Sequence, residues 1–227
     1  MTILALDTCT EMCSAAVLKD GKLFEKAELT YRGHSEKILG MMDDVLAQAD
    51  CSLKHIDLVA FGRGPGSFTG VRVGVGVAQG IAFARQLPVV PVSTLSAVAQ
   101  RAIDEHQAEQ VAVALDARMG EIYAAHFRAV DGYAQHCDQE QVCAPGLFKP
   151  MQEGVWFAAG SGWREYGDVL QAGFAGQIYK LDADLLPCAG AIARLAQQMA
   201  EQGAAIDADQ AVPVYLRDNV ARKKGEQ

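Results

Sequence analysis

Apolar and polar residues alternate in blocks along the first part of the chain, in a pattern that predicts three consecutive strands. Residues 3–6 form a continuous apolar run, which predicts a buried strand that ends at Asp7. Residues 14–18 predict a second strand and residues 23–29 a third. Between these two strands, Asp20-Gly21 is typical of a tight hairpin turn. We therefore expect the chain to begin with a strand followed by a β-hairpin.

The next segment shows the spacing of an amphipathic helix. Apolar side chains recur every three or four positions across residues 34–49, and Ser35 is the candidate N-cap. The stripe consists of Ile38, Met42, Val45 and Ala49, with Leu39 and Leu46 beside it.

Glycine and proline mark the start of a second helix. The loop at residues 62–67 follows a predicted strand at residues 56–61, and Ser67 or Thr69 is expected to cap a helix that reaches Arg85. The remaining elements expected in this half are a strand at residues 89–92 and a helix through residue 103, capped by Ser93 or Thr94.

The second half of the chain repeats the beginning of the first. Ala-Leu-Asp at residues 5–7 recurs at residues 114–116, and residues 15–19 have an echo in residues 124–128 at the same offset. The Asp-Gly hairpin signal returns at Asp131-Gly132. Two matches at one offset and the same turn favour a duplicated strand–hairpin unit.

This pattern predicts an α/β protein with the duplicated ribonuclease-H-like fold of actin and the sugar kinases (the ASKHA fold). Each lobe should contain a mixed sheet with flanking helices. We expect an N-terminal lobe at residues 1–105 and a smaller C-terminal lobe at residues 106–227. Later elements expected are a strand at residues 155–159 and helices at residues 165–172 and 190–202.

Composition narrows the functional classes. Half of the residues are hydrophobic, and the formal net charge is −8. Binding a nucleic acid requires clustered Lys and Arg side chains, so the net negative charge argues against a chain that binds RNA by itself. No signal-peptide pattern follows Met1, and the longest apolar run, residues 71–84, is too short to span a bilayer. We expect a cytoplasmic protein without a membrane segment, in which the six scattered cysteines are buried or half-buried thiols.

The glycine-rich segment at residues 62–80 allows three interpretations. As a phosphate loop it lacks the lysine of the GxxxxGK[ST] pattern, and the GxGxxG pattern is also absent. Alternatively, its first glycines only supply the backbone freedom of a tight turn around Pro65.

The third interpretation concerns the helix that follows. Gly74, Gly76 and Gly80 lie inside it, and each costs about 1 kcal/mol relative to alanine, so packing must offset this loss. Small residues at i, i+4 spacing allow another backbone to approach closely. One stripe can face the sheet of its own lobe and the other a second subunit. The stripes are Gly70, Gly74, Ala78 and Ala82, and Gly76, Gly80 and Ala84.

Side chains with catalytic chemistry do not gather into a recognisable motif. No HExxH pair and no GxSxG elbow is present. Asp7 and Asp116 end equivalent strands, but no glycine-bearing phosphate turn follows directly, and Arg118 could neutralise Asp116. We therefore expect no catalytic residue, no metal and no cofactor. A weak nucleotide or anion contact stays open at Asp7, Thr8, Ser67 and Thr69.

Several sequence motifs together resemble the TsaB (YeaZ) family. The most specific is the string GPGSFTGVR at residues 64–72. The others are at residues 3–8, 34–36, 92–95, 116–121 and 213–218, so the resemblance spans nearly the whole chain.

The resemblance implies a subunit of the machinery that makes threonylcarbamoyl-adenosine at position 37 of tRNAs. It implies a protein that catalyses no reaction itself and pairs with a catalytic TsaD-like subunit and a TsaE-like ATPase. It also implies that the chain contacts tRNA only indirectly, through the complex. In that family, the dimer contact is made by the first two helices of the N-terminal lobe. Carried over to this sequence, the resemblance places the following residues at the partner interface: Ser35, Ile38, Leu39, Met42, Gly70, Gly74, Gly76, Ala78 and Gly80.

Two alternatives stay open beside this hypothesis. A homodimer could form through the same helices. The chain could also act alone, as an actin-fold ATPase or a glycoprotease-like peptidase, although the missing glycine turn and histidine pair argue against both.

Overall fold

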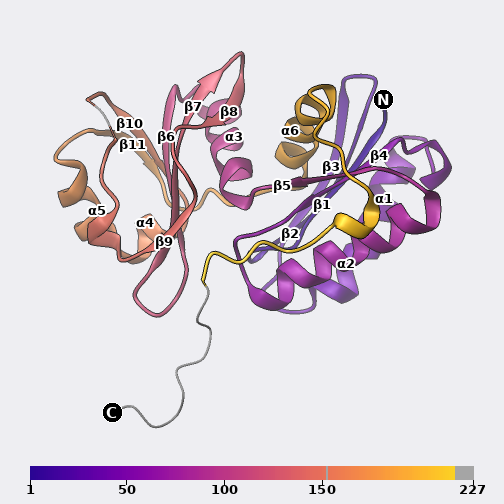
Figure 1. Ribbon diagram of the computed structural model, residues 1–227, viewed down its shortest axis with the longest axis horizontal. Coiled ribbons are helices and arrows are strands. Elements are labelled where there is room, and N and C mark those ends of the chain that lie inside the picture. Colours follow the sequence, from indigo (N-terminus) through magenta and orange to yellow (C-terminus); the bar gives the residue numbers. More distant parts are fainter. Residues whose placement is uncertain (152, 218–227) are drawn as a thin grey trace, which may run out of the picture.

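The computed structural model describes residues 1–151 and 153–217. A five-stranded sheet forms the first lobe, in the order β3-β2-β1-β4-β5 (Figure 1). The central strand β1 is antiparallel to β2 and parallel to β4. The strands are β1 (Ile3–Asp7), β2 (Met12–Lys19), β3 (Lys22–Leu29), β4 (Leu58–Gly62) and β5 (Val89–Val92).

The second sheet repeats this arrangement, in the order β11-β10-β6-β7-β8 with β9 paired to β7. Its central strand β6 is antiparallel to β7 and parallel to β10, as β1 is to β2 and β4. The predicted duplicated two-lobed α/β fold is therefore confirmed, and Asp7 and Asp116 end equivalent strands. The strands are β6 (Gln110–Asp116), β7 (Ile122–Val130), β8 (Tyr133–His136), β9 (Gln141–Cys143), β10 (Trp156–Ala159) and β11 (Ile178–Asp182).

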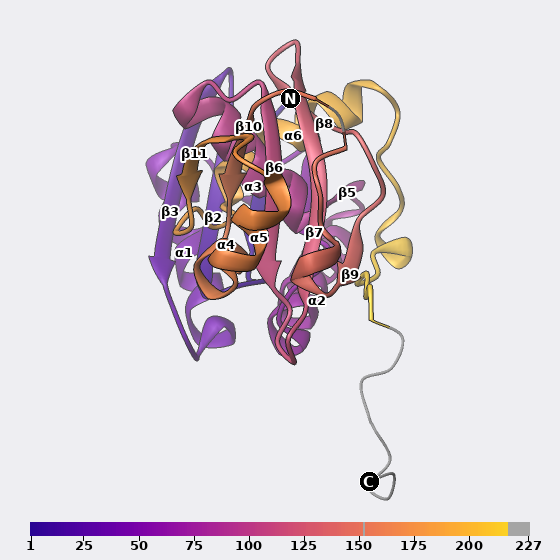
Figure 2. The same cartoon turned by 90° about the vertical axis from the view of Figure 1, so that its left-hand side faces the viewer.

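Helices cover the outer face of each sheet. In the first lobe, α1 (His34–Gln48) packs its apolar stripe on β2 and β3, and α2 (Phe68–Arg85) packs on β4 and β1. In the second lobe, α4 (Gly162–Glu165) and α5 (Gly167–Phe174) cover the outer face of the sheet (Figure 2). Short 3-10 helices lie at Leu53–His55, Pro145–Leu147 and Ala208–Gln210.

The inner faces of the two sheets are covered by exchanged helices (Figure 1). Helix α3 (Thr94–His106) packs on the second sheet, whereas α6 (Ala189–Glu201) packs on the first. The two helices also contact each other, and one continuous core joins both sheets through them. The sequence boundary predicted after residue 105 falls at the end of α3. In space, however, the chain returns to the first lobe with α6 and with the Val89–Ile206 bridge.

Helix starts follow the predicted capping chemistry with one exception. Ser67 Oγ accepts from the Gly70 N–H, and Ser93 Oγ accepts from the N–H groups of Leu95 and Ser96. Ser35 is not the cap of α1. That helix begins at His34, after Gly33 in a left-handed conformation (φ 88°), because glycine tolerates the turn that the chain needs there.

No helix within residues 1–151 and 153–217 combines the length and apolar character needed to cross a bilayer.

Candidate functional site

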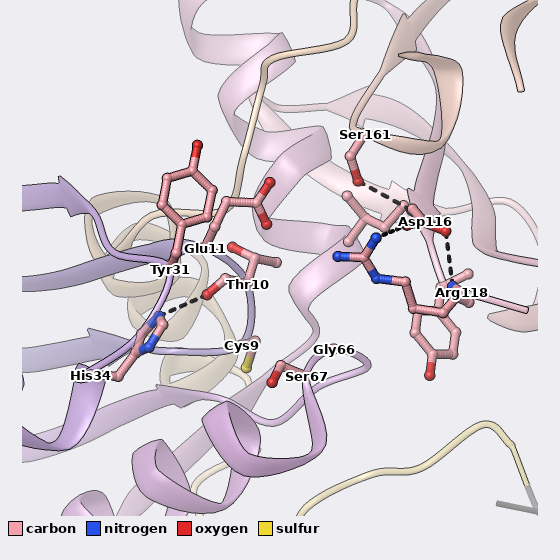
Figure 3. Close-up of a pocket in the computed structure, with 13 residues that line it drawn as sticks. Cys9, Thr10, Glu11, Tyr31, His34, Gly66, Ser67, Asp116, Arg118 and Ser161 are labelled. Atoms are coloured by element: carbon pink, nitrogen blue, oxygen red, sulfur yellow. Dashed lines mark hydrogen bonds and ion pairs between the residues drawn. The ribbon is translucent and has the colours of Figure 1, made fainter. Parts of the chain in front are cut away.

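A cleft of about 280 Å³ opens between the two lobes, at the ends of the equivalent strands β1 and β6 (Figure 3). One wall comes from the β1–β2 turn, the start of α1 and the loop before α2. The other wall comes from the β6–β7 turn and the loop before α4. Its lining residues are Cys9, Thr10, Glu11, Tyr31, His34, Gly66, Ser67, Leu115, Asp116, Ala117, Arg118, Tyr123 and Ser161.

Asp7 lies beneath the cleft and does not line it. Its side chain is fully buried, and no hydrogen bond from the described residues reaches either carboxylate oxygen. Burial raises the pKa of Asp7 from 3.8 to about 6, because the charged form is poorly solvated there. A Cβ on Gly62 would come within 2.0 Å of Oδ1. The backbone of β4 therefore packs directly against the carboxylate and leaves no space beside it for a ligand.

The chain's own β1–β2 turn occupies the space in front of the α2 N-terminus. The Ser67 N–H donates to the Cys9 carbonyl at 2.7 Å, and Thr8 Oγ1 donates to the Gly70 carbonyl at 2.6 Å. A Cβ on Gly70 would lie 2.0 Å from the Thr8 carbonyl oxygen, and one on Gly66 would lie 2.2 Å from the Cys9 carbonyl oxygen. The glycines therefore serve close backbone packing against this turn.

The four residues named for an anion contact do not form one site. Ser67 lines the cleft, but its hydroxyl caps α2. Asp7 and Thr8 are buried below the cleft, while Thr69 is exposed on the first turn of α2. The structure thus brings only Ser67 to the cleft surface.

On the opposite wall, the carboxylate of Asp116 already bonds to neighbouring protein groups. Its Oδ2 forms an ion pair with Arg118 at 2.9 Å, and its Oδ1 accepts from the Arg118 backbone N–H at 2.8 Å. The Tyr166 hydroxyl donates to the same Oδ1 at 3.4 Å. The contact between Arg118 and Asp116 that the sequence suggested is therefore present.

The cleft also gathers side chains that the sequence did not assign to a site. Tyr31 and His34 come from the start of the α1 region, and Tyr123 and Ser161 from the second lobe. The His34 ring bonds the Thr10 carbonyl at 2.9 Å, so it holds the β1–β2 turn rather than a ligand. The residues from the first lobe and those from the second lobe are about 90 or more positions apart in the sequence, so only the fold reveals their proximity.

The residues predicted at a partner interface fall into two groups. Five of them are buried within the first lobe, so the structure corrects their assignment: they pack against the lobe's own sheet and offer no surface to a partner. The other four are exposed on α1 or α2 and stay candidates. The buried group is Ile38, Met42, Gly70, Gly74 and Ala78, and the exposed group is Ser35, Leu39, Gly76 and Gly80.

The exposed side of α2 has an unusual composition for a surface helix. No charged residue occurs from position 73 to position 84. Gly76 and Gly80 are open, since a Cβ at either position would meet no described atom within 4 Å. Phe83, which sequence reasoning did not single out, is 75% exposed on this helix. On α1, Leu39 is 55% exposed.

Two histidines of the second lobe are held in structural contacts. The buried His126 ring bonds Asp138 at 2.8 Å and stacks on Phe148, and His136 bonds Ser96 at 3.0 Å. Across the described ranges, His, Cys, Asp and Glu side chains form no group of three or more that could hold a metal ion.

Comparison with known proteins gives consistent matches. The family model for TsaD, tRNA N6-adenosine threonylcarbamoyltransferase, matches residues 26–225. The tRNA threonylcarbamoyladenosine biosynthesis protein TsaB of Escherichia coli K12 is 42% identical, over 99% of this chain and 98% of its own length. The protein of the same name from Haemophilus influenzae is also 42% identical, over 99% of this chain and 97% of its own.

Solved structures agree with these relatives. YeaZ from Pseudomonas aeruginosa superimposes with a TM-score of 0.90 at 42% identity, covering 95% of this chain and 99% of that one. A second structure from that organism, described as an uncharacterized protein with similarity to peptidase YeaZ, gives the same values.

Proposed function

Because the chain belongs to the TsaB (YeaZ) family, we propose that it is a non-catalytic subunit required for threonylcarbamoylation of adenosine 37 in tRNAs that read codons beginning with A. Its relatives carry the name of tRNA threonylcarbamoyladenosine biosynthesis proteins. Its own part is to pair with a catalytic TsaD-like subunit and to support that subunit's activity.

The observation that carries this proposal is the outer face of α2. A helix that faces water normally carries charged residues, and an exposed uncharged face marks a contact surface. Here twelve consecutive positions, 73–84, have no charge, and Phe83 is 75% exposed among them. The open glycines Gly76 and Gly80 would let a partner helix approach closely.

A TsaD-like subunit is the partner that best fits this face. The chain itself matches the TsaD family model over most of its length, so the two subunits share one fold. Related folds can pair through equivalent helices, as in an isologous dimer. The TsaE-like ATPase would then join the assembled pair, and tRNA would be bound by the complex, consistent with the net charge of −8 on this chain.

Co-expression with the TsaD-like protein of the same source tests the pairing. Gly80→Leu should abolish co-purification while leaving the fold intact, because the added side chain points into solvent. Ala172→Leu makes a comparable change on the exposed side of α5 and should leave pairing unaffected. Full co-purification of the Gly80→Leu chain would refute the proposed interface.

The same experiment separates a homodimer from the proposed pair. Sedimentation of the free chain reports self-association, and addition of the TsaD-like subunit should displace any homodimer that uses α2. A homodimer that persists in the presence of the TsaD-like subunit would contradict the proposal.

A role as an independent ATPase or peptidase is less consistent with the cleft. Asp7 is buried beneath Gly62, and Asp116 forms an ion pair with Arg118. We expect the purified chain to release neither phosphate from ATP nor fragments from peptides above the blank. Sustained turnover that disappears in Asp7→Ala would overturn the non-catalytic assignment.

A further inference from the structure

The motif at residues 213–218 has no part in the function proposed above, and its last residue lies outside the described residues. Its described part, residues 213–217, makes specific contacts with both lobes. After α6 the chain runs along the first lobe and then crosses toward the second (Figure 1). Each of its contacts lies close to the rim of the interlobe cleft.

A backbone contact ties this segment to the first lobe. The Val214 N–H donates to the Arg63 carbonyl at 2.8 Å. The Val214 carbonyl oxygen lies so close to Gly64 that a Cβ there would come within 2.8 Å of it. Arg63 itself reaches the second lobe through an ion pair with Glu140 at 3.1 Å.

An aromatic stack then fixes the segment to the first turn of α2. The Arg72 guanidinium lies 3.5 Å from the centroid of the Phe68 ring and donates from Nε to the Tyr215 hydroxyl at 2.7 Å. The Phe68 and Tyr215 rings are 5.7 Å apart. Cation–π and hydrogen-bond contacts combine here, so Tyr215 is held more firmly than an ordinary surface side chain.

Arg217 makes the contact with the second lobe. Its guanidinium forms an ion pair with Glu121 and donates from Nη2 to the Arg118 carbonyl at 3.4 Å. Its Nη1 contacts the Met119 sulfur at 3.5 Å. The Arg217 side chain is only 17% exposed, so water screens this ion pair less than a typical surface pair.

These two anchors meet opposite rims of the cleft. Phe68 follows Ser67 on one wall, and Arg118 belongs to the other. We propose that residues 214–217 act as an interlobe clasp. The clasp fixes the width of the cleft while its contacts are made, and the cleft widens when they are released.

The position of the clasp explains why its release would open the cleft. The lobes also join through the α3–α6 core on the inner faces of the sheets, away from the cleft mouth. That core provides a hinge, and the clasp is a further attachment at the mouth, beside the Arg63–Glu140 ion pair. Loss of the clasp weakens the attachment at the mouth and allows the lobes to rotate about the hinge. Because α2 carries both the clasp stack and the uncharged face, a subunit docked on α2 could shift the clasp.

Hydrogen–deuterium exchange on the full chain tests the clasp without any partner, so its outcome is independent of the proposed function. Arg217→Ala should raise amide exchange about tenfold at residues 117–122 and 63–70, the two rims. Exchange in α5 and in β10 should stay unchanged. Arg164→Ala removes an exposed ion pair to Asp184 within the second lobe and should change neither rim.

A second variant separates the clasp from general stability. Tyr215→Phe removes only the hydroxyl that binds Arg72, and it should loosen the same two rims with a smaller effect and an unchanged melting temperature. Unchanged exchange at both rims in Arg217→Ala would refute the clasp. A uniform rise throughout the chain would do so as well, since it would mean general destabilisation.

Discussion

The carboxylate of Asp7 and the α-carbon of Gly62 are in such close contact that a single added methyl group would lie 2.0 Å from Oδ1. Asp7 ends the central strand of the first sheet, and Gly62 ends the neighbouring parallel strand. In this arrangement the acid is enclosed by its own lobe. The acid at the end of this central strand is therefore closed off from the interlobe cleft.

We expect Asp7→Asn to stabilise the protein at neutral pH. The pKa of Asp7 is raised from 3.8 to about 6, so the folded state binds this proton more tightly than the unfolded state. Stability contributed by the neutral acid is present below pH 4 and is lost as the pH rises toward 6 and above. This loss corresponds to about 3 kcal/mol, and the neutral amide avoids it. Urea unfolding between pH 4 and pH 8 measures the difference.

Below pH 4 the two proteins should have nearly equal free energies of unfolding. Asp43→Asn changes an exposed carboxylate on α1 and controls for the loss of one charge. An Asp7→Asn variant less stable than the parent at pH 8 would contradict this prediction.

Two glycine-to-alanine changes in α2 should have opposite signs. At Gly70 the new Cβ would lie 2.0 Å from the Thr8 carbonyl oxygen, and Gly70→Ala should cost about 3 kcal/mol through overpacking. At Gly76 the Cβ would meet no described atom within 4 Å, and Gly76→Ala should add about 1 kcal/mol through helix propensity. Equal effects in urea unfolding would show that the helix orientation is wrong.

The sequence could indicate that α2 has two small-residue stripes but could not decide which of them is buried. The i, i+4 spacing is the same for both stripes, and glycine has no side chain whose polarity reveals its environment. The structure places Gly70, Gly74 and Ala78 against the β1–β2 turn and the sheet, and it leaves Gly76 and Gly80 open.

Local features were predicted better than long-range ones. The caps at Ser67 and Ser93 and the hairpin at Asp20-Gly21 depend on neighbouring residues, and the structure confirms them. The cleft could not be predicted, because residues such as Tyr31 and Ser161 meet only through the packing of two lobes. An apolar stripe shows that α6 is buried, but it does not specify which sheet buries it.

The start of α6 should depend on side chains of the first lobe. Glu25 Oε1 accepts from the Gly190 N–H at 2.6 Å, and Ser14 Oγ accepts from the Ala189 N–H at 2.9 Å. These contacts satisfy free N–H groups at the helix N-terminus, where negative charge is also favourable. Glu25→Ala should therefore cost about 1–2 kcal/mol in urea unfolding.

Glu25→Gln keeps an acceptor and should lose less than Glu25→Ala. Glu28→Ala removes an exposed partner of Lys37 from the same strand and should change stability by less than about 0.5 kcal/mol. If Glu25→Ala were as mild as Glu28→Ala, the capping role of Glu25 would be rejected.

Phe83→Ser should weaken binding of the TsaD-like subunit about tenfold with little change in stability. The ring is 75% exposed in the free chain and lies on the uncharged face of α2, so its truncation removes apolar contact area only in the complex. Isothermal titration calorimetry measures the affinity. Leu147→Ser, at a similarly exposed apolar side chain of the second lobe, is the control and should bind normally.

The exchange of α3 and α6 between the sheets has a consequence for synthesis on the ribosome. The inner face of the first sheet is complete once β5 has been made, but the helix that covers it ends only at residue 201. During translation of the whole second lobe, that apolar face has no intramolecular cover. The nascent chain therefore cannot complete its first lobe until α6 has left the exit tunnel, whereas every element of the second lobe, including its covering helix α3, is made before α6.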